Sequence, residues 1–221
     1  MPTIGITGGI STGKTSFCDC LHEILPDAKF FNADKAARDL VDLDAEVKQE
    51  LRRAFGSGVF SGESLNRAAL RAIILESAAK KSALEQILHP RIRRQWSAEA
   101  QTHRNSSDFF FADIPLLYET GGETLCDRVV VVACTPEVQL SRLLERGSLG
   151  RDVAQEIINS QMPLTEKIAR ADHVVWNDGS WPVLSGQALT LVSHWQNQFK
   201  AWKKHDWTTT MLNPRRWPKN K

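Results

Sequence analysis

The chain lacks any long apolar run and has no large excess of charge of either sign. Within its 221 residues the apolar stretches are short, such as Val129 to Cys134, and fall far below the roughly 20 residues that a membrane-spanning helix needs. The first residues carry no basic segment before their apolar stretch, so we interpret them as a strand and not as a signal peptide. The 28 basic and 26 acidic residues give a net charge of +2, which neither indicates nor excludes a nucleic-acid partner. Composition therefore predicts an ordinary globular protein with no membrane partner.

Cysteine is scarce, and its spacing is not that of a metal site. The four cysteines, Cys18, Cys20, Cys126 and Cys134, form no C-x-x-C pair and have no His-rich segment beside them. This spacing argues against zinc. Without a secretory signal, we expect reduced thiols that are buried as small apolar side chains in a cytoplasmic protein.

Strand and helix patterns alternate at both ends of the chain. Residues 3–7 are apolar or β-branched, a helical pattern follows to about residue 25, and residues 29–32 form a second strand candidate. A strand, a helix and a strand within so short a segment predict a βαβ unit and a parallel sheet. Further strands are expected at 108–114, 128–133 and 173–176, with helices at 138–145, 152–161 and 184–202.

The middle of the chain, from residue 35 to about 102, shows helical spacing and no strand pattern. We expect an inserted helical region there. Its later helices are expected at 67–77 and 81–88, and a further helix should have Pro90 inside it or at its start.

The strongest motif runs from Gly8 to Thr15 and fits the phosphate-binding pattern G-x-x-x-x-G-K-[ST] between a predicted strand and a predicted helix. Glycines let the backbone turn its N–H groups toward phosphate oxygens, and the start of the helix adds positive potential. We expect Lys14 to reach the β- and γ-phosphates and the Thr15 hydroxyl to bind Mg²⁺. Ile10 stands where a dinucleotide-binding turn would need glycine, which excludes that alternative. The nucleotide-binding residues expected here are Gly8, Ser11, Thr12, Gly13, Lys14, Thr15 and Ser16.

Two acidic residues, Asp34 and Asp113, lie at the ends of predicted strands. No N-K-x-D guanine-binding tetrapeptide occurs, which argues against a GTPase. A kinase needs a group that takes the proton of the acceptor hydroxyl, and Asp34 is a candidate because the carboxyl ends of parallel strands line one crevice. A helix N-cap accounts for Asp34 equally well. Asp113 is a candidate for holding Mg²⁺ through water or for orienting the acceptor, with a turn or cap residue as the alternative.

Three arginines, Arg142, Arg146 and Arg151, surround a glycine-containing turn. Arginines on a mobile segment are suited to close over phosphates and to neutralise charge in the transition state. A solvated helix face is the alternative that chemistry alone favours for them.

The last segment, residues 200–221, holds seven basic residues against one acidic residue, with Trp202, Trp207 and Trp217 between them. This composition is compatible with binding to nucleic acid or to an acidic surface. A plain C-terminal extension is the favoured interpretation.

From about residue 3 to residue 190, the sequence resembles the dephospho-CoA kinase family, with the family's motifs in the same order and spacing. The segments that resemble H-P-x-I-R and D-I-P-L-L are the most specific of them. The matching segments are Ile6 to Ile10 leading into Gly13-Lys14-Thr15; Asn32-Ala33-Asp34 with Arg38; Leu65-Asn66-Arg67 with Leu70; Leu84-Glu85 with Leu88-His89-Pro90 and Ile92-Arg93; Asp113 to Glu119; Gln139, Arg142, Leu143 and Arg146; and Gln161-Met162-Pro163 with Glu166-Lys167, Ala171-Asp172, Asn177 and Gly179.

The resemblance implies a reaction in which ATP, with Mg²⁺, phosphorylates the 3′-hydroxyl of the ribose in dephospho-CoA, the last step of CoA biosynthesis. It implies an α/β fold with a three-layer P-loop NTPase core around a central parallel sheet. The expected partners are ATP and dephospho-CoA, and nucleic acid is not an expected partner. The chain would be a monomer or a weak homo-oligomer. The alternatives are another small-molecule or nucleoside-monophosphate-type kinase, and an NTP-dependent nucleic-acid-binding module.

The expected parts of the chain are a core at 1–34, 106–140 and 162–199, a helical substrate-binding region at 35–105, a lid at 141–161 and a basic extension at 200–221.

The resemblance also implies residue roles. Asp34 becomes the expected base, and Lys14, Arg142 and Arg146 become the expected catalytic cations. Other expected ATP-binding residues are Arg151 in the lid and Asn177 and Gly179 beside the adenine. The residues expected around the acceptor are Asp34, Arg38, His89, Arg93, Asp113, Leu116, Tyr118 and Glu119, although a purely structural hydrogen bond is the alternative for His89.

Four positions depart from the family pattern. Asn32 replaces the first acidic residue of D-A-D, Asn66 replaces the aspartate of L-D-R, and Tyr118 stands where phenylalanine is common. Ile157 occupies a position where many members carry arginine, so we expect Arg151 to serve in its place.

Overall fold

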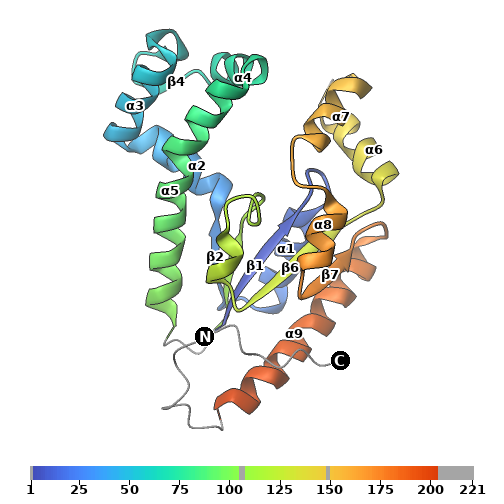
Figure 1. Cartoon of the computed structure of the whole chain (residues 1–221). Coiled ribbons are helices and arrows are strands. Elements are labelled where there is room, and N and C mark those ends of the chain that lie inside the picture. The colour runs from blue at the N-terminus through green and yellow to red at the C-terminus, as the bar shows by residue number, and fades with distance from the viewer. Residues whose placement is uncertain (1, 105–107, 148–149, 204–221) are drawn as a thin grey trace. The chain divides into compact units, whose positions relative to one another are not determined.

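The computed structural model describes residues 2–104, 108–147 and 150–203, and the chain forms two compact units (Figure 1). The first unit comprises Met1–Phe30 and His103–Lys221. The second unit comprises Phe31–Thr102.

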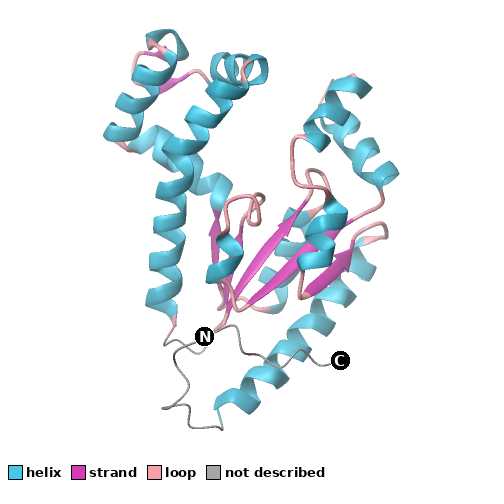
Figure 2. Ribbon diagram, in the orientation of Figure 1, coloured by secondary structure: helices cyan, strands magenta, loops and turns pink. Residues whose placement is uncertain are grey.

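A five-stranded sheet forms the centre of the first unit, with its strands in the order β2-β5-β1-β6-β7 (Figure 2). β1 (Thr3–Gly8) lies between β5 (Phe110–Asp113) and β6 (Arg128–Ala133) and is parallel to both. β7 (His173–Trp176) runs parallel to β6, and β2 (Lys29–Asn32) lies at the opposite edge beside β5. Every residue of β1 is buried, as expected for a parallel strand that is covered on both faces. The predicted parallel sheet is confirmed.

Two helices pack together over one face of this sheet. α1 (Lys14–Ile24) follows β1 directly, and α9 (Trp181–Lys203) is the last helix of the described chain. Phe17 and Leu21 of α1 and Trp195 of α9 are fully buried in the same apolar cluster. This packing fixes the start of α1, and therefore the end of the loop that precedes it.

The remaining helices of the first unit lie between β5 and β7 in the sequence. α6 and α7 lie side by side in Figure 1, and α8 contacts β6. α8 was not expected from the sequence. The elements are the 3₁₀ helix η2 (Gly122–Leu125), α6 (Pro136–Arg146), α7 (Arg151–Asn159) and α8 (Leu164–Arg170).

The second unit is helical, as predicted, but the expectation that it has no strand is wrong. A short antiparallel hairpin, β3 (Phe60–Ser61) with β4 (Ser64–Leu65), turns at Gly62, whose φ is 63°. Strands of this length show too little alternation to be recognised in a sequence. The other elements are α2 (Ala33–Leu43), α3 (Ala45–Phe55), the 3₁₀ helix η1 (Ser57–Val59), α4 (Arg67–Glu76) and α5 (Ala78–His103).

α5 is one continuous helix with Pro90 inside it, whereas the sequence predicted one helix at 81–88 and a further helix with Pro90 inside it or at its start. Proline has no N–H to donate one turn back, and its ring crowds the preceding turn. The next residue, Arg91, ties this part of the helix together, because its guanidinium donates to the carbonyl of Ile87 at 2.8 Å and also to the Glu50 carboxylate at 2.7 Å. The helix continues past the proline.

The two asparagines that depart from the family pattern are both helix N-caps. The Asn32 side chain accepts a hydrogen bond from the backbone N–H of Lys35 at 2.7 Å, and Asn66 accepts one from Ala69 at 3.0 Å. Asparagine and aspartate cap helices about equally well, so neither replacement disturbs the local fold. Because Asn32 caps α2, the N-cap alternative for Asp34 is wrong.

The cysteines are free thiols. Cys18, Cys20 and Cys134 are buried, as predicted, whereas Cys126 is only half-buried. Burial raises the pKa of the Cys134 thiol to about 11, although the nearby Arg142 guanidinium acts in the opposite direction. This thiol is therefore protonated at neutral pH. In the described residues, the structure contains no helix long and apolar enough to cross a membrane.

Candidate active site

The predicted phosphate-binding segment forms a tight loop between β1 and α1. β1 ends at Gly8, and Gly13 caps the start of α1 with a left-handed φ of 90°. Ser11 has a φ of 59° and is the only non-glycine residue with positive φ in the described part of the chain. The Thr12 hydroxyl donates to the Gly9 carbonyl at 2.9 Å and closes the turn. The loop thus ends at a helix N-terminus, the arrangement that binds phosphate through backbone N–H groups.

Asn177 packs against this loop from the end of β7. Its side-chain amide donates to the Thr12 carbonyl at 3.0 Å. A Cβ placed on Gly13 would lie only 1.9 Å from the same amide nitrogen. Position 13 therefore requires glycine for two reasons, its left-handed backbone and the absence of space for a side chain.

We expect Gly13→Ala to lower the free energy of unfolding by about 2–4 kcal/mol, because left-handed strain and steric overlap add. It should also weaken ATP binding at least tenfold, since the loop must shift. Gly62→Ala is the matched control, because Gly62 is also left-handed but a Cβ there meets nothing within 4 Å. Urea unfolding and calorimetry with ATP measure both effects, and equal losses in the two variants would contradict the role of the overlap.

Lys14, the first residue of α1, forms an ion pair with Asp113 at the carboxyl end of β5. Lys14 Nζ donates to Asp113 Oδ1, and the two side chains are only 12% and 5% exposed. Asp113 is the last residue of β5 and is paired in register with Ile6 of β1. The structure thus brings together the predicted phosphate-binding lysine and the predicted acidic residue.

Thr15 and Asp113 supply the oxygen donors that Mg²⁺ prefers. Thr15 is exposed on the first turn of α1, and the Asp113 carboxylate lies beside Lys14. No cluster of three or more His, Cys, Asp or Glu residues suited to a metal occurs among the residues that the structure describes. Mg²⁺ commonly takes only one or two protein ligands together with substrate phosphates, so the residues present fit this ion.

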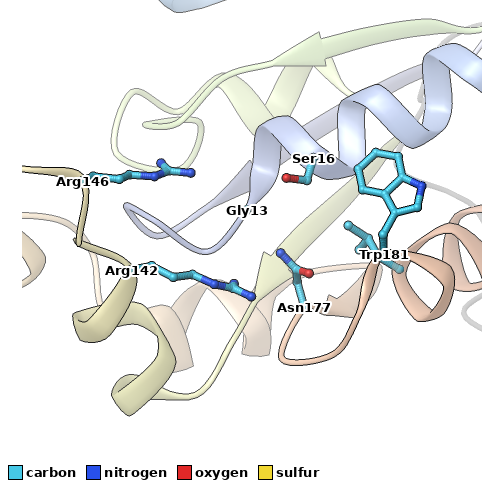
Figure 3. Close-up of a pocket in the computed structure, with 7 residues that line it drawn as sticks. Gly13, Ser16, Arg142, Arg146, Asn177 and Trp181 are labelled. Carbon is cyan, nitrogen blue, oxygen red and sulfur yellow. The ribbon is translucent and has the colours of Figure 1, made fainter. Parts of the chain in front are cut away.

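A pocket of about 200 Å³ opens beside Gly13 at the start of α1 (Figure 3). Arg142 and Arg146 of α6 line it, and Figure 3 shows both side chains on the loop side of the pocket. The Nη1 atom of Arg142 is buried and has no hydrogen-bond partner among the described residues. Arg151, in contrast, is exposed at the first residue of α7 and does not line this pocket. The lining residues are Gly13, Ser16, Arg142, Arg146, Asn177, Trp181 and Leu184.

Trp181 and Leu184 line the pocket but were not expected there from the sequence. Both belong to α9, whose start lies four residues after Asn177. No local pattern distinguishes a pocket tryptophan from an exposed one, so nothing in the sequence marked them. Gly179, which was expected beside the adenine, does not line the pocket, and a Cβ added there would lie 3.4 Å from the Val183 side chain.

Ile157 belongs to an apolar cluster between α6 and α7. Leu140, Leu143 and Ala154 are buried there, and Ile157 and Ile10 pack against them. Ile157 therefore belongs to the apolar contact between the two helices of the predicted lid, and Ile10 of the phosphate-binding loop packs against the same cluster.

The turn after β5 carries three of the residues expected around the acceptor, Leu116, Tyr118 and Glu119. Leu116 is half-buried, whereas Tyr118 is buried with the Arg170 guanidinium 4.4 Å from the centre of its ring. Burial raises the pKa of the Tyr118 hydroxyl. The Glu119 carboxylate forms an ion pair with Lys167 Nζ at 2.8 Å. Lys167 was not predicted from the sequence as a site residue. A role of these residues toward an acceptor stays a prediction.

The second unit holds the other residues predicted around the acceptor. Asp34 and Arg38 are both exposed and are one turn apart on α2. His89 and Arg93 are likewise one turn apart on α5, and both are half-buried. Burial lowers the pKa of His89, so its imidazole is neutral at pH 7. In the basic extension, the Trp202 side chain, Trp207 and Trp217 lie outside what the structure describes.

Residues 2–182 match the model of one protein family, described as dephospho-CoA kinase. The dephospho-CoA kinase of Listeria innocua is 35% identical over 198 residues, covering 88% of this chain and 98% of its own. That of Syntrophotalea carbinolica is 38% identical over 198 residues, covering 87% and 92%.

Solved structures show the same similarity. The Thermus thermophilus protein TT1252 is 29% identical and superposes with a TM-score of 0.72, covering 87% of this chain and 97% of its own. The dephospho-CoA kinase of Campylobacter jejuni is 25% identical with a TM-score of 0.61, covering 87% and 96%. The likeness thus extends over the sheet, its flanking helices and the inserted helical unit.

Proposed function

This chain belongs to the dephospho-CoA kinase family, and we propose that it transfers the γ-phosphoryl group of ATP to the 3′-hydroxyl of the ribose in dephospho-CoA. The products are CoA and ADP. The observation that carries the proposal is the phosphate-binding loop, with Lys14 held beside Asp113 and an arginine-lined pocket at Gly13. This arrangement is suited to a triphosphate and not to a dinucleotide.

The phosphate-binding loop and its neighbours bind and orient the triphosphate. Backbone N–H groups and the start of α1 bind the β- and γ-phosphates, and Lys14 contributes its charge. Arg142 and Arg146 neutralise the charge that spreads over the transferring group, and the buried, unpaired Nη1 of Arg142 supports this role. The pocket beyond them takes the nucleoside, with Trp181 and Asn177 in its lining.

Asp34 is the proposed general base. It accepts the proton of the 3′-hydroxyl as the oxygen attacks the γ-phosphorus and ADP leaves. Its carboxylate is exposed and is not used as the cap of α2, because Asn32 performs that function. Arg38 and Arg93 are suited to the phosphates of the acceptor, and neutral His89 offers a hydrogen bond without a charge.

Mg²⁺ accompanies ATP in this proposal. Thr15 through its hydroxyl and Asp113 through its carboxylate would hold the ion. Bound there, Mg²⁺ would offset the negative charge of the β- and γ-phosphates. Lys14, now paired with Asp113, would turn toward the same phosphates.

An acceptor panel tests the proposal. We expect ADP release from ATP with dephospho-CoA to exceed that with nucleosides or nucleoside monophosphates by at least a hundredfold. The product should gain one phosphate, and nuclear magnetic resonance should place that phosphate on the 3′-oxygen. Faster turnover with a nucleoside monophosphate would replace the proposal with the other class of small-molecule kinase.

A further inference from the structure

We propose that Lys167, Gln139 and Asn177 are positioning residues that hold three carbonyl groups of the phosphate-binding loop away from the phosphates of the nucleotide. The inference rests on the proposed function in one respect, that a nucleoside triphosphate binds to this loop. All three side chains come from residues 139–177, far from the loop in sequence. Together they fix every second peptide of the segment from Gly8 to Thr12.

Lys167 holds the first of these carbonyls. Its side chain is fully buried, and its Nζ lies 3.1 Å from the Gly8 carbonyl, 3.1 Å from the Pro115 carbonyl and 2.8 Å from the Glu119 carboxylate. An ammonium group has three hydrogens, so each of them has one acceptor here. A buried lysine is tolerated only when its charge and all its donors are matched, as they are at this position.

Gln139 holds the second carbonyl. Its Nε2 donates to the carbonyl of Ile10 at 2.8 Å, while the N–H of Ile10 donates to Gln161 Oε1 at 3.0 Å. Because a backbone carbonyl only accepts and a backbone N–H only donates, both amide orientations follow from these contacts. The Gln139 amide also fits closely against Gly9, where an added Cβ would lie 2.6 Å from Nε2.

Asn177 holds the third carbonyl, that of Thr12, at 3.0 Å. Its own backbone N–H donates to the Ala133 carbonyl at 2.7 Å, which anchors it to the end of β6. The side chain is therefore attached to the sheet and not to a loop that moves freely.

These three contacts determine where the N–H groups of the loop point. The described chain contains no cis peptide bond, and in a trans peptide the carbonyl and the following N–H point in opposite directions. A carbonyl held outward at Gly8, Ile10 or Thr12 therefore turns the N–H of the next residue inward. The loop is then ordered for phosphate before the nucleotide arrives, which avoids the cost of ordering it on binding.

A pair of Gln→Glu variants tests this inference by calorimetry with ATP. In Gln139→Glu a carboxylate that can only accept replaces the donor to the Ile10 carbonyl, and we expect the Kd for ATP to rise at least tenfold. In Gln161→Glu the acceptor for the Ile10 N–H is retained, and we expect a rise of less than threefold. Both variants add the same charge beside the same residue, so equal effects would mean that charge alone acts and would overturn the inference.

A second variant, Gln139→Met, removes the donor without adding charge. We expect it to raise the Kd for ATP at least fivefold, and it decides the question if Gln139→Glu does not fold. A merely structural role would lower the fraction of binding-competent protein and leave the Kd of that fraction unchanged, which the binding stoichiometry reveals.

The proposed function and this inference fail in different ways. Wild-type protein that binds ATP but does not phosphorylate dephospho-CoA would refute only the proposed acceptor, whereas unchanged ATP binding in both Gln139 variants would refute only this inference. Wild-type protein that binds no ATP would refute both.

Discussion

Replacing Asp34 with asparagine is expected to lower kcat by about 10²–10⁴-fold, the usual contribution of a general base. Asparagine keeps the size and polarity of the side chain but cannot accept the proton of the 3′-hydroxyl. The Kd for ATP should change less than twofold, because the residues that bind the triphosphate belong to the first unit. ADP release measures kcat, and calorimetry measures ATP binding.

Asp39→Asn is the matched control for that experiment. Asp39 lies on the same helix and forms a surface ion pair with Lys35. Exposed pairs of this kind contribute little to stability, so the control should retain normal turnover. Near-normal kcat in Asp34→Asn would remove Asp34 as the base and would direct attention to another carboxylate.

The sheet and the phosphate-binding loop can be predicted from the sequence because their signals are local. β6 contains four consecutive valines, and β1 leads directly into the glycines of the loop. Parallel strands that are buried on both faces give such continuous apolar runs. The motif from Gly8 to Thr15 also lies within one short segment, so its chemistry and its context are read together.

The course of α5 could not be predicted in the same way. A proline normally interrupts a helix, and the sequence shows nothing that opposes the interruption at Pro90. In the folded chain the next residue, Arg91, contacts a carbonyl one turn back and Glu50 on α3. A contact between residues so far apart in sequence becomes visible only in the folded chain.

Contacts between segments that are distant in sequence also decide which residues form the candidate site. Which arginine faces the pocket depends on the geometry of α6, and the structure selects Arg142 and Arg146 over Arg151. Lys167 reads as an ordinary helical lysine, yet it is fully buried because three acceptors from other segments meet around it. The family motifs contain Lys167, Gln139 and Gln161, but a motif alone does not say which atoms they contact.

Replacing Lys14 with alanine is expected to lower kcat/KM for ATP by about 10²–10³-fold, as for other groups that stabilise developing charge. The loss should appear both in a higher Kd for ATP and in a lower kcat, because the ammonium binds the phosphates before and during transfer. Calorimetry and ADP release separate the two contributions. Near-normal values in both would contradict the proposed triphosphate site.

The same substitution has a second consequence, because Lys14 is ion-paired with a buried carboxylate. Removing the cation should lower the free energy of unfolding by about 3 kcal/mol, the usual cost of breaking a buried pair. Adding Asp113→Asn to Lys14→Ala removes the charge that is left behind, so most of this stability should return. Turnover should not return with it, because the ammonium group that contacts the β- and γ-phosphates is still missing. A double variant that regained turnover would show that Lys14 acts through the fold and not through the triphosphate.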